Sequence, residues 1–311
     1  MTQINQHIKS AVLLICFNRP DTTKVVFESI RKVKPKKLYV AIDGARISKP
    51  GESDLCAKVL KITKDIDWDC EVEYLIRDKN LGCKMGVTTA ISWALTNEDR
   101  IIIIEDDIIA APAFYYFADQ MLEKYKNEKN IAAVSANNYT PIEDSQNDYF
   151  FSKYGHIWGW ATWKRAWDAF DVEVPYIDSD IKNGYLKRLG LETQELKYFN
   201  KLAKKISRLI HNGQINTWDY QFVYYRIRNQ FISIVPKVNL ASNIGINSSR
   251  INSKTKINTN YYPAVGDFIV QKHPQKVECN LIYDQYHFKS HINRKPSFIK
   301  RALAKVLKSF H

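Results

Sequence analysis

The sequence predicts an α/β protein built on a mostly parallel sheet with helices on its faces. One observation behind this prediction is that short runs of apolar, β-branched residues alternate along the chain with segments that have helical periodicity. Another is the uninterrupted run of isoleucines at 101–104, which is typical of a strand that is covered on both faces.

The expected elements follow in chain order, and the apolar pattern and the turn residues justify each of them. Strands are expected at 11–17, 37–42, 71–76, 101–104, 131–135 and 231–235. Helices are expected from Pro20 or Asp21, from Asp54 with Ser53 as its cap, after the Asn80–Gly82 turn and from Pro112. A later long helix is expected to end at Asn212–Gly213. The stretch 243–260, rich in Asn, Ser, Lys and Thr, is expected to form a loop.

The chain of 311 residues is long enough for a large domain with an ample core. We expect one large domain over 1–245 and a C-terminal extension over 246–311. The extension ends in a basic amphipathic segment at 295–311, for which two interpretations stay open. A helix of this kind lies either on an anionic membrane surface or on its own domain.

The formal net charge of +13 indicates a polyanionic partner such as a phosphorylated substrate or an anionic membrane. Nucleic acid is the weakest candidate, because no recognised binding motif accompanies the charge. The five cysteines are scattered and include no C-x-x-C pair, which favours a reducing compartment over a disulfide framework. No stretch is long enough to span a bilayer, so a cytoplasmic location is expected, with the inner membrane face as the alternative.

The central isoleucine run leads directly into Glu105, Asp106 and Asp107. Three adjacent carboxylates repel one another, so a positive charge is expected beside them. Oxygen ligands suit Mg²⁺ or Mn²⁺, and Mg²⁺ often joins carboxylates to substrate phosphates. Because ligands of open α/β sheets bind at the carboxyl ends of strands, this tip is a candidate metal–phosphate site. The plain alternative is a solvated acidic turn.

Polar side chains also follow the other expected strands. Asn18 and Arg19 follow the first strand and Asp43 the second, while Lys84 stands near the start of the helix after the third. Arg19 can grip a phosphate with two hydrogen bonds, and Lys84 can meet phosphate at the positive end of its helix. Singly these are ordinary turn or surface residues; together, on one sheet edge, they favour a nucleotide-diphosphate site. The glycine-rich motifs of dinucleotide-binding and P-loop proteins are absent.

Two further candidates lie later in the chain. If Asn216 or Thr217 caps the next helix, Asp219 lies in its first turn, where the helix end favours the ionised form that a general base needs. Acidic residues are as common there for stability alone. Among the clustered tryptophans, Trp160 beside a glycine is the better candidate for stacking on an acceptor sugar, whereas Trp163 and Trp167 are expected in the core.

The order of these motifs resembles that of the GT-A glycosyltransferases, in particular bacterial family 2-like nucleotide-sugar transferases related to animal N-acetylglucosaminyltransferase I. The resemblance covers roughly residues 10 to 245. The matching segments are LLICFNRPD at 13–21, AIDG at 41–44, NLGCKMGVTTAISWAL at 80–95, IIIIEDDIIAAPAFYYF at 101–117, AAVSANN at 132–138, GHIWGWATWKRAW at 155–167 and TWDYQF at 217–222.

The resemblance implies a role for each matching residue at the strand ends. Arg19 would contact the diphosphate and Asp43 the uracil. Glu105 and Asp106 would touch the ribose and the sugar, and Asp107 would ligate Mn²⁺ or Mg²⁺.

The resemblance also implies that Asp219 is the base, with one departure from the family pattern. The animal enzyme has two adjacent aspartates after its tryptophan, whereas here Tyr220 follows Asp219, so only Asp219 can serve. Some relatives use a late histidine on the metal; His273 and His287 are candidates that stay unassigned.

These features together predict a metal-dependent inverting glycosyltransferase. It would move a sugar from a nucleotide-diphosphate sugar, expected to be UDP-linked, to a glycan or lipid-linked acceptor hydroxyl. Two alternatives stay open: a nucleotidyltransferase that makes a nucleotide sugar, and a non-enzymatic protein that binds glycans or membranes.

Overall fold

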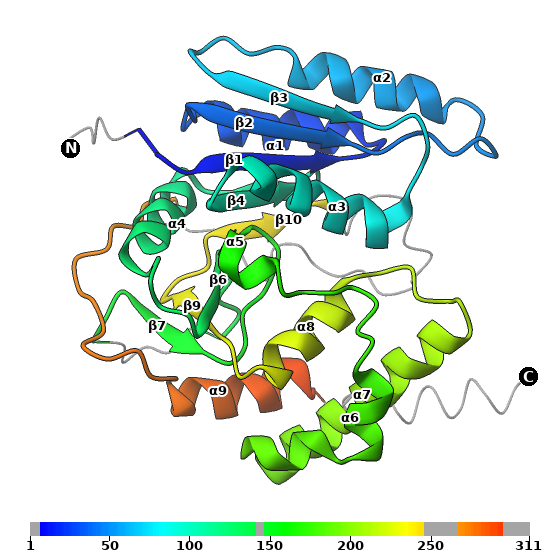
Figure 1. Ribbon diagram of the computed structural model, residues 1–311. Helices are drawn as coiled ribbons and strands as arrows, with labels where there is room; N and C mark the ends of the chain where they lie inside the picture. Colours follow the sequence, from blue (N-terminus) through cyan, green and yellow to red (C-terminus); the bar gives the residue numbers. More distant parts are fainter. Residues whose placement is uncertain (1–6, 141–145, 246–265, 295–311) are drawn as a thin grey trace, which may run out of the picture.

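The computed structural model describes residues 7–140, 146–245 and 266–294, and it contains an eight-stranded sheet with helices on both faces (Figure 1). The strand order is β3-β2-β1-β4-β8-β6-β9-β7, and β5 and β10 form a separate two-stranded sheet. The strands are β1 (Ala11–Cys16), β2 (Lys37–Ile42), β3 (Glu71–Ile76), β4 (Arg100–Glu105), β5 (Ile108–Ala110), β6 (Ile131–Ser135), β7 (Tyr149–Ser152), β8 (Trp160–Trp163), β9 (Ile232–Pro236) and β10 (Ala241–Asn243). The predicted fold class is confirmed.

In the described residues, helices alternate with the first strands. The helices are α1 (Pro20–Arg31), α2 (Glu52–Thr63), α3 (Gly82–Asn97), α4 (Pro112–Lys124), α5 (Lys164–Trp167), α6 (Ile177–Lys182), η1 (Tyr185–Leu189), α7 (Thr193–His211), α8 (Asp219–Arg228), α9 (Leu281–His287) and η4 (Phe288–Ile292). From α5 to α8 the helices follow one another, and α9 comes after β9 and β10. Proline at the first position of α1 and of α4 suits a helix start, because its missing N–H would have no helical partner there.

The first half of the sheet is parallel, because β1 pairs with β2 and β4, and β2 pairs with β3. The carboxyl ends of these four strands therefore share one edge. Beyond β4 the sheet is mixed: β8 runs antiparallel between β4 and β6, β9 runs parallel to β6, and β7 closes the far edge antiparallel to β9.

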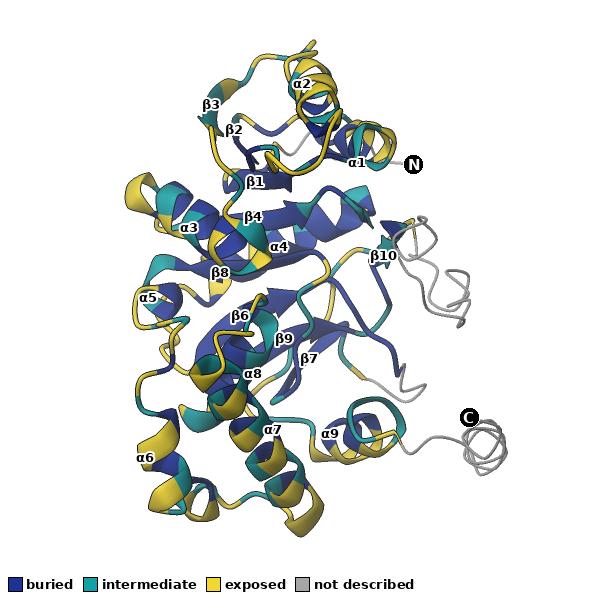
Figure 2. Ribbon diagram, turned by 90° about the vertical axis from the view of Figure 1, so that its right-hand side faces the viewer, coloured by how far each residue is buried: buried dark blue, intermediate teal, exposed yellow. Residues whose placement is uncertain are grey.

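Alternate residues of the central strands supply two cores, one on each face of the sheet. Val12 and Leu14 pack with α1 and α4, whereas Leu13 and Ile15 pack with α3 and with aromatic residues from the second half of the chain. All six residues of β1 are buried, as a strand between two helical layers requires. Figure 2 shows these buried strands in dark blue between helices whose outer faces are exposed.

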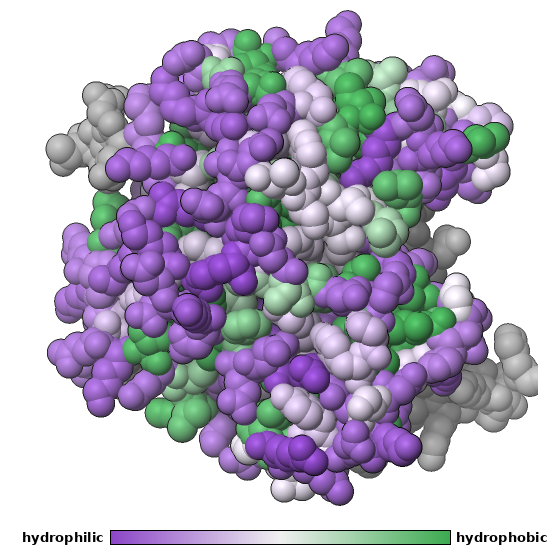
Figure 3. Space-filling view, in the orientation of Figure 1, coloured by the Kyte–Doolittle hydropathy of each residue, from purple (hydrophilic) through white to green (hydrophobic). Residues whose placement is uncertain are grey.

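A third core joins α6, η1, α7 and α8 below the sheet (Figure 1). Phe199, Leu202 and Ile206 of α7 pack there against Tyr224 and Ile227 of α8. The opposite face of α7 is polar, which matches the largely hydrophilic surface in Figure 3. The sequence therefore places a solvent-facing helix beside the start of α8.

The described part of the expected C-terminal extension, residues 266–294, packs on the outer strand of the sheet. Asn280 donates its backbone N–H to the carbonyl of Phe151 at 2.8 Å, and the carboxylate of Asp284 accepts hydrogen bonds from Ser152 and Lys153. The amphipathic segment 295–311 lies outside the described residues. Within the described ranges, all five cysteines are free thiols and no helix is both long and apolar enough to cross a bilayer.

Candidate functional site

The turn after β1 and the acidic end of β4 are joined by backbone hydrogen bonds. Parallel pairing sets Ile15 opposite Glu105, and the N–H of Asp106 donates to the carbonyl of Ile15 at 2.9 Å. The N–H of Phe17 donates in turn to Oδ2 of Asp106 at 2.9 Å. One carboxylate of the acidic cluster thus holds the β1 turn in place, as the strand-end prediction required.

Arg19 lies against this acidic cluster. Its Nη1 is 2.6 Å from Oδ2 of Asp107 and 3.4 Å from Oδ1 of Asp106. The Nε of Arg19 is buried, and within the described residues it has no hydrogen-bond partner. A charged guanidinium that retains an unused donor at the sheet edge is suited to an anionic ligand.

Glu105 has no such partner, since its side chain makes no hydrogen bond or ion pair within the described part of the chain. Desolvation raises the pKa of Glu105 to about 8, and repulsion from Asp107 and Asp106 adds to this shift. A carboxylate is displaced in this direction when negative charge outweighs the positive charge nearby. Arg19 alone does not balance the cluster, so the site favours an added cation.

The donor set fits Mg²⁺ or Mn²⁺ only as a shared site. Within the described residues, no group of three or more His, Cys, Asp or Glu side chains converges as a metal held entirely by protein would need. Mg²⁺ is commonly held by one or two carboxylates together with substrate phosphates, and Asp107 and Glu105 provide that minimum.

A loop from the far end of the chain closes over Asp107. β10 pairs antiparallel with β5, and beyond this pairing the N–H of Ile244 donates to the carbonyl of Asp107 at 2.8 Å. Asn243 accepts the N–H of Gly245 at 2.8 Å and so fixes the turn. Our sequence analysis missed this contact; the only signal for it was the glycine at the end of a short apolar segment.

Asp219 is the first residue of α8, and its carboxylate accepts a hydrogen bond from the hydroxyl of Thr217. The expected cap was wrong: Trp218, not Asn216 or Thr217, holds the N-cap position, and it makes no side-chain cap. Asp219 nevertheless lies in the first turn, where the helix end favours its ionised form.

Asp219 lies close enough to the acidic cluster to act on it electrostatically. Its negative charge contributes to the raised pKa of Glu105. Partial desolvation raises the pKa of the Cys83 thiol to about 11, and Glu105 and Asp219 both add to that shift. The start of α3, the end of β4 and the start of α8 therefore lie near one another, and the N–H of Lys84 donates to the carbonyl of Asn216 at 3.2 Å.

The carboxylate of Asp43 accepts hydrogen bonds mainly from the backbone around it. Its Oδ1 accepts from the N–H of Gly44 at 3.1 Å and of Leu81 at 2.9 Å, and its Oδ2 accepts from Gly82 N–H at 3.1 Å and from Asn80 Nδ2 at 3.0 Å. This carboxylate thus ties the end of β2 to the start of α3. A contact between Asp43 and uracil stays a prediction.

Asn18 and Lys84, the two other expected nucleotide contacts, each interact with a glutamate. Asn18 is only 2% exposed, and its Nδ2 donates to Oε1 of Glu52 at 2.5 Å. Arg46 pairs with the same Glu52, and these hydrogen bonds lower the pKa of Glu52 to about 2. Lys84 pairs with Glu173 at 2.5 Å instead of facing Arg19. Asn18 thus supports the turn from a buried position, Lys84 is paired with Glu173, and their contacts with a nucleotide stay predictions.

The expectation that Trp160 stacks on an acceptor sugar is corrected. Its side chain is 1% exposed, and the indole stacks on Trp218 with ring centroids 5.9 Å apart. A covered ring has no face for a sugar, so Trp160 belongs to the core, as do Trp163 and Trp167, for which this was expected. Trp158 is the tryptophan of this cluster that is exposed, at 37%.

The two late histidines are engaged elsewhere and stay unassigned as metal ligands. His273 lies 2.8 Å from the hydroxyl of Tyr149. His287 is held between the hydroxyl of Thr140 and the ring of His156.

Comparisons with known proteins add little to this geometry. No family model matches the chain, and no curated protein matches it. Among solved structures, the chain is similar to a crystal structure of UDP-glucose pyrophosphorylase complexed with UDP-glucose, with a TM-score of 0.36 and 10% sequence identity, over 76% of this chain and 94% of that one. A likeness at this level carries no argument, so function must be argued from the chain's own residues.

Proposed function

We propose that this chain is a metal-dependent inverting glycosyltransferase. It transfers a sugar from a nucleotide-diphosphate sugar, UDP-linked, to a hydroxyl of a glycan or lipid-linked acceptor. The observation that supports the proposal is that Arg19 pairs with the Glu105–Asp107 cluster at the carboxyl ends of parallel strands, with Asp219 near enough to act on the charge of Glu105.

In this proposal, Arg19 holds the diphosphate, using the donors that Asp106 and Asp107 leave unused. Asp107 would hold Mn²⁺ or Mg²⁺, which when bound neutralises charge on the departing nucleoside diphosphate. The carboxylate of Glu105, which has no ion pair within the described residues, would contact the ribose and the sugar.

Asp219 takes the proton of the acceptor hydroxyl, and Thr217 orients its carboxylate. The acceptor oxygen forms a bond to the anomeric carbon from the face opposite the leaving group. The bond between that carbon and the phosphate oxygen breaks, and its electron pair leaves with the nucleoside diphosphate. Attack from the opposite face inverts the anomeric configuration.

The decisive experiment compares Asp219→Asn and Asp107→Ala. With Mn²⁺ and a panel of nucleotide sugars, the first variant should bind nucleotide in calorimetry but turn over about 10²–10⁴-fold more slowly, the usual cost of one positioned base. The second should lose the metal-dependent part of nucleotide binding. Asp54→Asn is the matched control, because Asp54 is an exposed first-turn aspartate of α2. An active Asp219→Asn enzyme would end the assignment.

The same preparation tests the alternatives. Release of pyrophosphate from a nucleoside triphosphate and a sugar 1-phosphate would favour a nucleotidyltransferase, although the short Asn18-Arg19-Pro20 turn has no glycine-rich loop for a triphosphate. Glycan binding that ignores nucleotide, metal and the Asp107→Ala change would favour a binding protein. Peripheral attachment to the cytoplasmic membrane face, through segment 295–311, is part of the proposal only as an expected location.

A further inference from the structure

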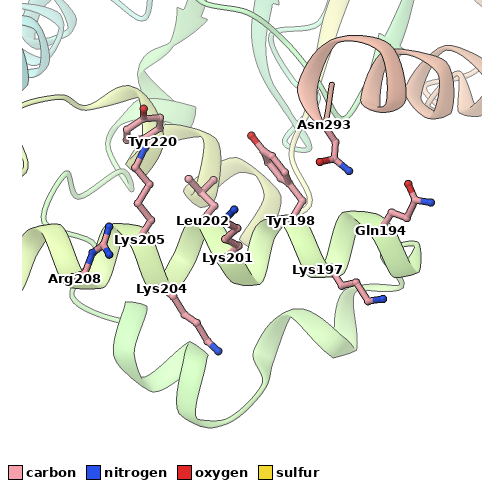
Figure 4. A pocket seen from close by; sticks show the side chains of 10 residues that line it. All are labelled: Gln194, Lys197, Tyr198, Lys201, Leu202, Lys204, Lys205, Arg208, Tyr220 and Asn293. Carbon is pink, nitrogen blue, oxygen red and sulfur yellow. The ribbon is translucent and has the colours of Figure 1, made fainter. Parts of the chain in front are cut away.

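One face of α7 carries a row of basic side chains beside the proposed site. Their spacing places them on one side of the helix over about 16 Å, at 1.5 Å per residue. The row consists of Lys197, Lys201, Lys204, Lys205 and Arg208. It lines a groove of about 940 Å³ together with Gln194, Tyr198, Leu202, Tyr220 and Asn293 (Figure 4).

The positive charge of this row is not compensated by the protein. Within the described residues, none of its five cations forms an ion pair with a carboxylate. The nearby acids are engaged elsewhere, because Asp178 pairs with His211 at 3.4 Å and the buried Glu195 pairs with Lys153 at 2.9 Å. A second hollow of about 720 Å³ on the same helix adds Lys182 and Lys187 to the surface. The groove is therefore suited to a polyanion.

One part of the groove lies against the first turn of α8. The ammonium of Lys205 lies 3.8 Å from the ring centroid of Tyr220, which directly follows Asp219 in α8. Figure 4 shows Lys205 reaching towards Tyr220, whereas Lys197 and Lys204 extend from the other edge of the helix, with Gln194 and Asn293 at the far end. A molecule bound along the row therefore reaches the first turn of the helix that carries Asp219.

We propose that this groove holds the acceptor by a phosphate group that the acceptor carries. The inference rests on the proposed glycosyl transfer and narrows its acceptor to phosphorylated glycans and glycosyl phosphates. Four of the five cations are lysines, and lysine binds phosphate as a point charge. A phosphate also carries more negative charge per group than a carboxylate, so closely spaced cations attract it more strongly.

The test measures binding of inorganic tripolyphosphate by calorimetry, in an Arg19→Ala background that removes the other phosphate contact. The groove variant is Lys201→Gln/Lys204→Gln/Lys205→Gln. Its matched control is Lys58→Gln/Lys61→Gln/Lys64→Gln, at exposed positions of α2 and its C-cap, and the two triple variants have the same net charge. The groove variant should bind about tenfold or more weakly, and the control within about twofold of the parent. Thermal unfolding checks that all three proteins are folded.

Equal affinity of the groove variant and the control would overturn the proposal. So would tighter binding of a uronic-acid oligomer than of tripolyphosphate, or capture by phosphatidylcholine–phosphatidylglycerol vesicles that the groove changes abolish. The assay uses no metal and no nucleotide sugar, so its failure would refute the groove alone. A groove that binds phosphate in a chain that ignores every nucleotide sugar would refute the glycosyl transfer instead.

Discussion

Gly245 lies so close to Asp107 that a Cβ atom built on it would stand 2.2 Å from the Asp107 Oδ2. Real Cβ atoms do not approach an oxygen to that distance, so any other residue must displace either the loop or the carboxylate. Arg19 in the turn after β1 pairs with the Asp107 side chain, and the loop after β10 hydrogen-bonds the Asp107 backbone carbonyl. The position of Asp107 is therefore set by segments far apart in the sequence.

Gly245→Ala should damage the site without unfolding the protein. The added methyl must push the Asp107 carboxylate aside, and overpacking of this kind costs about 1–3 kcal/mol, which would appear as a loss of about tenfold or more in metal-dependent nucleotide affinity. Calorimetry with UDP and Mn²⁺ measures it. Gly266→Ala is the control, because a Cβ there meets nothing within 4 Å. Unchanged affinity of Gly245→Ala would show that the loop does not set the position of Asp107.

Asp43→Asn should lower stability. Both oxygens of Asp43 accept N–H donors, and an asparagine would turn its own NH₂ group towards one set of them. Loss of a charged acceptor at the start of α3 costs about 1–2 kcal/mol, measured as the free energy of unfolding in urea. The exposed Glu128→Gln is the comparison for removing one negative charge. Wild-type stability combined with weaker UDP binding would assign Asp43 to the uracil instead.

The strand ends could be predicted because local signals and topology agree there. The strands at 37–42, 71–76 and 131–135 have the predicted bounds, since apolar runs end at turn residues. The parallel order of the strands then brings Arg19 and Asp107 to one edge of the sheet, independently of the conformation of the loops. This part of the site follows from chain order alone.

The rest depends on contacts that no local pattern encodes. β8 is a strand between β4 and β6, but its Trp-rich sequence carries no alternation of polar and apolar residues, and Gly159 precedes it at a φ of 74°. That turn directs Trp160 into the core, which the glycine alone does not reveal. The contact between Gly245 and Asp107 joins positions in distant parts of the chain, so its only local trace is one glycine.

Trp160→Ala should cost stability, whereas Trp158→Ala should not. Trp160 is 1% exposed among Trp218, Trp167 and Phe222, and removing a buried tryptophan costs about 3–5 kcal/mol. Trp158 is 37% exposed, and surface changes usually stay within about 0.5 kcal/mol. Urea unfolding of both variants measures the difference. A stable Trp160→Ala protein with impaired use of acceptor would restore the sugar-stacking role.

The buried pair His156 and His287 should make folding acid-sensitive. Their Nε2 atoms lie 2.9 Å apart, which requires one ring to donate and the other to accept. Burial lowers the pKa of His287 to about 3 and that of His156 well below its usual value. Below about pH 6.5 the unfolded chain gains protons that the folded chain does not, so the free energy of unfolding falls as pH falls.

The measurement compares the wild type with His287→Gln, because other groups act in the opposite direction. Burial raises the pKa of Asp284 to about 6 and desolvation that of Glu105 to about 8, so both stabilise the fold on acidification, equally in the two proteins. Between pH 7.5 and 5.5, the wild type should lose about 1 kcal/mol more than His287→Gln. The exposed His211→Gln should behave as the wild type does. Parallel pH profiles for wild type and His287→Gln would show that burial of this ring does not govern acid stability.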